Sequence, residues 1–128
     1  MNLFTVAEAN ALLPKLKPRL AELMAIRRRM RERQPALARL ISREPVANGG
    51  NRAASELAFD LERFERLIRE INSLGCLLKD VDTGLIDFPA ELDGRVVYLC
   101  WQYGEEAVMW WHDLEAGYAG RRPLRPQQ

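Results

Sequence analysis

His112 is the chain's only histidine, so it decides whether an imidazole metal ligand or acid–base group is available near neutral pH. If the C-terminal segment is a helix, Glu105 lies seven residues before His112 and Glu115 three after it, on roughly one face. Asp80 and Asp87, on preceding predicted strands, could approach that face. Such mixed imidazole and carboxylate groups bind divalent iron, manganese or zinc (Fe, Mn or Zn). We favour the alternative, a hydrogen-bonded histidine at a packed edge of the fold.

Aromatic side chains gather in the same part of the sequence. The tryptophans and tyrosines are Tyr98, Trp101, Tyr103, Trp110, Trp111 and Tyr118. Such rings most often supply the core of a small fold. The adjacent Trp110 and Trp111 would point about 100° apart on a helix, so one could face outward as a ligand or partner contact.

The candidate pocket around His112 needs walls and counter-charges. We take Trp101 and Trp111 as its candidate walls, which could also form a ligand or partner interface. Lys79 and Arg121 could neutralise the carboxylates, and the pocket would then be a structural network of ion pairs.

The composition is that of a soluble globular protein. Of 128 residues, 48% are hydrophobic and 29% are charged, which fits one domain over 1–128 and excludes a disordered chain. No apolar run approaches the roughly 18 residues of a membrane span, and "MNLFTVAEAN" lacks the features of a secretory signal. Cys76 and Cys100 are too few for a disulfide scaffold and are interpreted as small core residues. We therefore expect a cytoplasmic protein.

Charge is distributed unevenly, although the net charge is only +1. Residues 1–44 carry ten basic and four acidic side chains, giving +6, whereas residues 55–115 carry five and fourteen, giving −9. The stretch "IRRRMRER" could contact nucleic-acid phosphates. We favour a solvated helix face that pairs with Asp60, Glu62 and Glu65 of the neighbouring helix, and we expect no nucleic-acid partner.

The start of the chain carries clear helix signals. Thr5 and Glu8 have the spacing of a capping box, which begins a helix. Pro14 and Pro18 remove helix donors and clash with preceding carbonyls, so they predict a short first helix, a break, and a long helix from about Pro14. Pro35 should bend or interrupt that long helix.

A loop and a second helix follow. The segment 43–54 contains glycine, asparagine and proline and predicts an exposed, flexible loop. From Ser55, apolar residues recur at four- and three-residue steps up to Gly75, a favourable C-terminal residue. These residues are Leu57, Leu61, Phe64, Ile68 and Ile71. The spacing is typical of a coiled coil, so we predict an antiparallel hairpin of long helices over 5–75.

The remaining sequence predicts strands and then a helix. We expect strands near 76–80, 85–90 and 95–101, the last two joined by a tight turn through the Asp93-Gly94 dipeptide.

Glu105 and Glu106 suit the positive end of a helix, which should end near Gly117 and leave a tail over 118–128. The β-hairpin and this helix would occupy 76–117. The predicted fold class is therefore α+β, mainly α: the helical hairpin followed by a short three-stranded antiparallel sheet and a C-terminal helix.

Three stretches of the chain resemble a known bacterial family. They are "FTVAEANALLP", "GCLLKDVDTGLIDFPAELDGRVVYLCWQYGE" and "WHDLEAGYAGRRPL", and together they span nearly the whole chain. They are similar to domain of unknown function 2203. The resemblance implies a small bacterial cytoplasmic protein with a helical hairpin and a short sheet, and it supplies no activity. The polar positions that match the family pattern are Lys79, Asp80, Asp87, Trp101, Glu105, His112 and Arg121.

Two functions fit the sequence. The first is a non-enzymatic interaction or regulatory module that forms a homodimer or binds a protein partner through the helical hairpin, because its apolar stripes exceed what a small sheet can cover. The alternative is a binding protein or an enzyme that holds a divalent metal or small ligand in the carboxylate and histidine pocket around His112.

Overall fold

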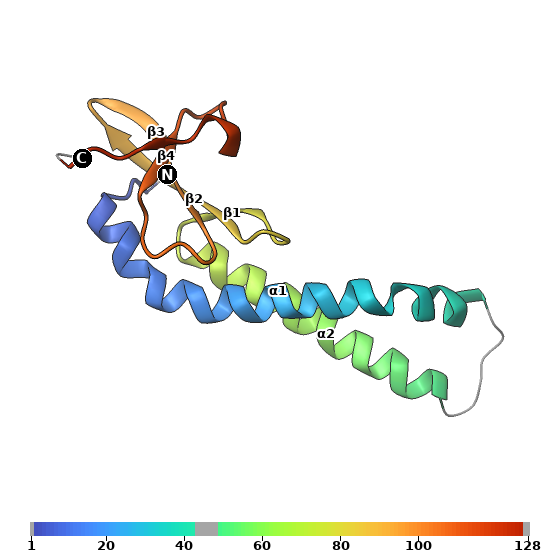
Figure 1. Cartoon of the computed structure of the whole chain (residues 1–128). Coiled ribbons are helices and arrows are strands. Elements are labelled where there is room, and N and C mark those ends of the chain that lie inside the picture. Colours follow the sequence, from blue (N-terminus) through green and yellow to red (C-terminus); the bar gives the residue numbers. More distant parts are fainter. Residues whose placement is uncertain (1, 43–48, 127–128) are drawn as a thin grey trace.

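The computed structural model describes residues 2–42 and 49–126 (Figure 1). Within these residues the chain forms two long helices followed by a five-stranded antiparallel sheet. The elements are α1 (Val6–Ser42), α2 (Gly49–Ser73), β1 (Leu77–Asp80), β2 (Leu85–Leu92), β3 (Arg95–Gln102), β4 (Trp110–His112), the 3-10 helix η1 (Tyr118–Gly120) and β5 (Arg122–Pro123). The predicted fold class is therefore wrong, because a five-stranded sheet replaces the three-stranded sheet and the C-terminal helix.

The first helix starts as predicted and then continues through its prolines. The Thr5 amide donates to Glu8 Oε1 at 2.9 Å, and the Glu8 amide donates to Thr5 Oγ1 at 3.0 Å, so the capping box is formed. The predicted break near Pro14 and Pro18 is absent, and Figure 1 shows α1 as one continuous, curved helix. Both prolines lie on the exposed face, four residues apart, while the opposite face is buried. Packing of that buried face keeps the helix intact despite the lost hydrogen bonds.

The second helix begins earlier than its sequence signals indicate. It starts at Gly49, whereas we predicted a start at Ser55 after a loop over 43–54. The segment 43–48 of that loop lies outside the described residues. Ala53 and Ala54 are strong helix formers, and glycine is least costly in the first turn, which explains the longer helix.

The sheet is a simple meander in which each strand pairs with the next along the chain. The turn between β2 and β3 has Asp93 at φ 52° and Gly94 at φ 77°, and it pairs Leu92 with Arg95. Two successive residues with positive φ are typical of the tight turn that suits the right-handed twist of a hairpin. The predicted turn through the Asp93-Gly94 dipeptide is therefore present.

The segment predicted as the C-terminal helix forms an edge of the sheet. Trp111 on β4 pairs with Leu99 on β3, and with Arg122 on β5. The aromatic residues of β4 favour a strand, and the open edge of β3 offers hydrogen bonds along its length. Glu105 does not begin a helix as predicted. Its carboxylate accepts a hydrogen bond from the Gln102 amide at 2.7 Å.

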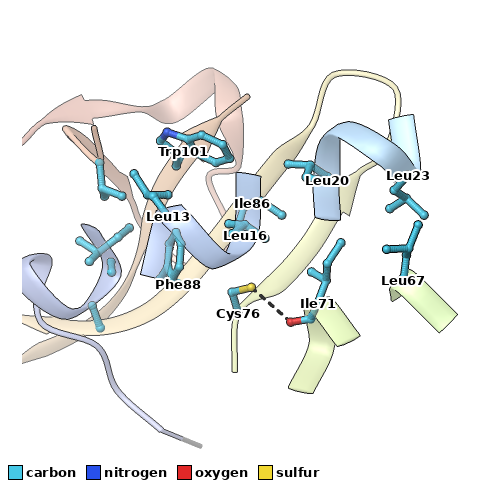
Figure 2. Close-up of a cluster of buried hydrophobic side chains, with 14 of the residues drawn as sticks. Leu13, Leu16, Leu20, Leu23, Leu67, Ile71, Cys76, Ile86, Phe88 and Trp101 are labelled. Atoms are coloured by element: carbon cyan, nitrogen blue, oxygen red, sulfur yellow. Dashed lines mark hydrogen bonds between the residues drawn. The ribbon is translucent and has the colours of Figure 1, made fainter. Parts of the chain in front are cut away.

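The main core lies between the hairpin and one face of the sheet (Figure 2). Its members include Leu13, Leu16, Leu20, Leu23 and Ile26 of α1, Leu67 and Ile71 of α2, and Ile86, Phe88, Leu99 and Trp101 of the sheet. Cys76 joins this cluster, and its thiol donates to the Ile71 carbonyl at 3.5 Å. The sheet covers the end of the hairpin where α1 begins and α2 ends, and the rest of the hairpin projects away from it (Figure 1).

Alternation along the strands sends different side chains to the second face of the sheet. Ile86 and Phe88 point to the helices, so Asp87 between them points to the other side. Leu99 and Trp101 likewise flank Cys100, which is buried but lies outside the cluster that packs on the helices. The second face therefore also carries buried side chains, here a carboxylate and a thiol.

Candidate functional site

Three buried side chains with metal-binding chemistry meet on the second face of the sheet. Asp87 lies on β2, Cys100 on β3 and His112 on β4, and each is at most 2% exposed. The backbone register places Asp87 directly opposite Cys100, and His112 opposite Tyr98, which is two residues from Cys100. The carboxylate, thiol and imidazole ligand atoms all lie within 4.8 Å of one another. We call these three residues the Asp–Cys–His group.

Both ring nitrogens of His112 face oxygen acceptors. Nδ1 lies 2.7 Å from the Asp113 carbonyl oxygen, which can only accept, so Nδ1 carries a hydrogen and donates it. Nε2 lies 3.0 Å from Oδ1 and 3.1 Å from Oδ2 of Asp87. One further proton must therefore lie between the imidazole and the carboxylate, either on Nε2 or on Asp87. The ring is thus held by two hydrogen bonds in a single orientation.

The Cys100 thiol is a neutral member of the group. Burial, opposed by the nearby Arg121 guanidinium and reinforced by the nearby Asp87 carboxylate, raises the pKa of the Cys100 thiol to about 12. The thiol therefore keeps its proton at neutral pH unless a metal ion binds the sulfur in place of that proton. The prediction that Cys100 is a buried residue is confirmed, but its place beside Asp87 and His112 was not predicted. Strand alternation separates Cys100 from Trp101 and Leu99 and so indicates its face, whereas only the register with Asp87 shows its neighbours.

The other predicted carboxylates lie elsewhere. Asp80 accepts from the Asp82 amide at 3.0 Å and from the Thr83 hydroxyl at 2.9 Å, so it shapes the turn after β1. Glu105 pairs with Arg121, and Glu115 lies exposed in the turn after β4. In the described part of the chain, the structure brings only Asp87 of the predicted carboxylates to His112.

The predicted pocket walls also lie away from His112. Trp101 is fully buried on the helix-facing side of the sheet, and its Nε1 donates to the Glu105 carbonyl at 3.1 Å. Trp111 is half-buried, with Arg95 and Arg122 at 5.6 and 5.3 Å from its ring centroid. Residues 110–112 form a strand instead of part of the predicted helix, so Trp110 and not Trp111 lies on the same face of the sheet as His112.

Lys79 and Arg121 surround the group without joining it. The Lys79 ammonium lies 5.7 Å from the centroid of the Tyr98 ring, and that ring lies 5.6 Å from the His112 ring. Arg121 donates to Glu105 Oε1 at 2.7 Å and to the Cys100 carbonyl at 3.3 Å. Its guanidinium also lies 5.0 and 4.6 Å from the ring centroids of Trp110 and Tyr118. Arg121 thus holds the segment 113–121 against the second face of the sheet.

The fold and site together define a small α+β protein: a helical hairpin that carries an antiparallel meander with a buried carboxylate, thiol and imidazole on its second face. The chain belongs to the DUF2203 family, described as "Uncharacterized conserved protein", whose family model matches residues 2–124. The resemblance predicted from the three sequence stretches is confirmed. No curated protein and no solved structure matches the chain. Among the described residues, no helix is long and apolar enough to cross a membrane.

Proposed function

We propose that the chain is an interaction module that associates through its helical hairpin, and that its partner is a second copy of the same chain. The observation that supports this is the width of the apolar stripe on α2. Asp60, Leu67 and Ile71 are buried, and they mark the side of α2 that packs on α1. Leu57 and Leu61, on the adjoining flank, are only partly covered, with Leu61 40% exposed.

Helix geometry makes this flank a separate contact surface. Leu57 and Leu61 lie about 40° apart around the helix and next to the buried side, so the apolar stripe is wider than one neighbouring helix can cover. Wide stripes are typical of bundles in which each helix has two neighbours. Leu61 is 40% exposed, so neither α1 nor the sheet covers this flank fully.

Charge complementarity favours a second copy as the neighbour. Arg28 is exposed on α1, whereas Glu56 and Glu65 are exposed on α2, and none of the three forms an ion pair with a described residue. In a twofold-symmetric bundle, α1 of each hairpin can lie against α2 of the other. Arg28 of each copy can then approach Glu56 or Glu65 of the other, which favours this arrangement over one that brings like charges together.

Sedimentation equilibrium at micromolar concentrations tests the proposal, with Leu61→Glu as the disrupting variant. Phe59→Glu is the matched control, because Phe59 is 68% exposed but lies about 200° away around the same helix. We expect a dimeric wild type, a monomeric Leu61→Glu and a dimeric Phe59→Glu. A monomeric wild type, or a Leu61→Glu protein that stays dimeric, would overturn the proposal.

The proposal includes a cytoplasmic location and no nucleic-acid partner. Most of the "IRRRMRER" arginines are already paired within the chain, through Arg29–Asp60, Arg33–Asp60, Arg27–Asp82 and Arg31–Asp82. These pairs reduce the positive field that would attract phosphates. Titration of a fluorescent DNA duplex at physiological salt tests this, and tight, salt-resistant binding would contradict it.

The alternative function, metal or small-ligand binding around His112, is favoured by one specific observation. Asp87 and His112 are in direct contact in a buried setting, and Cys100 adds a third ligand type. Such a group supports a metal site of different composition from the predicted pocket, in which Asp80, Glu105 and Glu115 have no part.

A further inference from the structure

We propose that Asp87, Cys100 and His112 bind a single divalent transition-metal ion, and that zinc suits these ligands best. The three ligand atoms come from three adjacent strands, so their spacing is fixed by the sheet rather than by mobile loops. Zinc binds imidazole nitrogen and carboxylate oxygen at about 2.0–2.2 Å and thiolate sulfur at about 2.3 Å. Ligand atoms within 4.8 Å of one another can therefore surround one ion with small side-chain adjustments.

The orientation of His112 supports this site independently of the spacing. Histidines that bind metals commonly donate their other ring N–H to a carbonyl or carboxylate, which fixes the tautomer and aims the free nitrogen at the ion. His112 makes this bond, from Nδ1 to the Asp113 carbonyl at 2.7 Å. Nε2 is thereby aimed at Asp87, on the side where Cys100 also lies.

The charges of the bound site balance. Without an ion, the group holds one proton between His112 and Asp87 and one on the Cys100 thiol, and its net charge is zero. A divalent ion replaces both protons and leaves neutral imidazole, carboxylate and thiolate around a 2+ charge, so the net charge is again zero. Binding therefore adds no uncompensated charge to a buried region, and it releases two protons per ion.

The Cys100 thiol coordinates the ion only after it has lost its proton, and the charge of the ion itself drives that loss. Arg121 donates to the Cys100 carbonyl at 3.3 Å and to Glu105 Oε1 at 2.7 Å, so it lies beside Cys100 with its own charge balanced. An ion bound nearby deprotonates a coordinating thiol outright. Three protein ligands leave the fourth tetrahedral position for water or an added ligand.

The approach to the site lies on the side of the sheet away from the helices. The segment 113–121 crosses this side (Figure 1), and Arg121 holds it through its bond to the Cys100 carbonyl. An ion can therefore reach the group if this segment moves, without opening the core between the sheet and the hairpin.

Cobalt titration of the full chain, prepared without an affinity tag and stripped of metals, tests the proposal. Cobalt replaces zinc and reports thiolate ligation by a sulfur-to-cobalt charge-transfer band. We expect saturation near one equivalent, the charge-transfer band, displacement of cobalt by zinc, and release of about two protons per ion in weakly buffered solution.

The two cysteines provide matched variants. Cys100→Ser should lose the charge-transfer band and bind cobalt at least about tenfold more weakly, whereas Cys76→Ser, in the helix-facing core, should behave as wild type. Circular dichroism of each variant separates loss of the ligand from loss of the fold, and Asp87→Asn supplies a second ligand variant if Cys100→Ser unfolds. Absence of saturable binding in the wild type, or an unchanged band in Cys100→Ser, would overturn the proposal.

Discussion

Removal of the His112 imidazole should destabilise the metal-free protein strongly. His112 and Asp87 are 2% and 1% exposed, and Nε2 lies 3.0 Å from the carboxylate. The variant His112→Ala leaves Asp87 buried without this partner, and loss of one partner of a buried pair costs about 3–5 kcal/mol. That is a large fraction of the total stability of a domain of this size, about 5–15 kcal/mol. Urea unfolding in the presence of a chelator measures the change.

Two further variants make this result interpretable. Arg95→Ala breaks an exposed ion pair, whose side chains are 59% and 41% exposed, and should cost at most about 1 kcal/mol. Asp87→Ala combined with His112→Ala should cost less than the sum of the two single changes by about 0.5–3 kcal/mol, because the partners interact directly. A His112→Ala protein within about 1 kcal/mol of wild type, or strict additivity in the double variant, would refute the coupling inferred for this pair.

Three other perturbations test separate parts of the structure. Burial raises the pKa of Cys76 to about 11 and that of Cys100 to about 12, from 9.0 in an unfolded chain. The unfolded thiols ionise first, so their contribution to the free energy of unfolding should be constant below about pH 9. Above that pH it should fall by about 1.4 kcal/mol per pH unit for each thiol, until the folded thiols ionise as well. A Cys76→Ala, Cys100→Ala double variant should lose this part of the slope in urea unfolding. Asp60→Asn should cost about 2 kcal/mol, against less than about 1 kcal/mol for Glu22→Gln, because Asp60 is only 4% exposed and accepts from two arginines. The same arginines lower the pKa of Asp60 below 3.8. The stability that Asp60 contributes is therefore present above that pH and is lost as the pH falls. In thermal melts from pH 7 to about pH 3, the melting temperature of Asp60→Asn should fall less than that of the wild type. Thr5→Ala should cost about 1 kcal/mol through loss of the cap, and an unchanged melting temperature would contradict the role of that hydrogen bond.

Local signals predicted the elements whose structure is decided by neighbours in sequence. The capping box at Thr5 and the turn at Asp93 depend on residues within a few positions, and both are present. The continuous course of α1 was not predictable in this way. Pro14 and Pro18 oppose a helix locally, and the burial of the opposite face against the sheet outweighs them.

In the C-terminal segment, local signals indicated a helix where the structure has a strand. Glu105 and Gly117 carry the signals of a helix start and end, but Glu105 is engaged by the Gln102 amide and by Arg121. Trp110 to His112 instead complete the edge of β3, which is a contact between residues distant in sequence.

The sequence predicted only those site residues that reach the site even though the C-terminal segment is a strand and not a helix. Asp87 and His112 were both identified from the sequence, and they meet because their strands flank β3. Glu105 and Glu115 were assigned through a helical spacing that does not exist here. Cys100 was missed because a lone cysteine in an apolar strand is most often a core residue, and only the register with Asp87 shows its place in the group.

X-ray absorption spectroscopy of the zinc-loaded protein tests the metal-site claim most directly, because it reads the ligand atoms themselves. We predict one sulfur neighbour at about 2.3 Å together with nitrogen or oxygen neighbours at about 2.0–2.2 Å, and loss of the sulfur neighbour in Cys100→Ser but not in Cys76→Ser. A zinc environment of nitrogen and oxygen alone in the wild type would contradict the assignment of Asp87, Cys100 and His112 as the ligands.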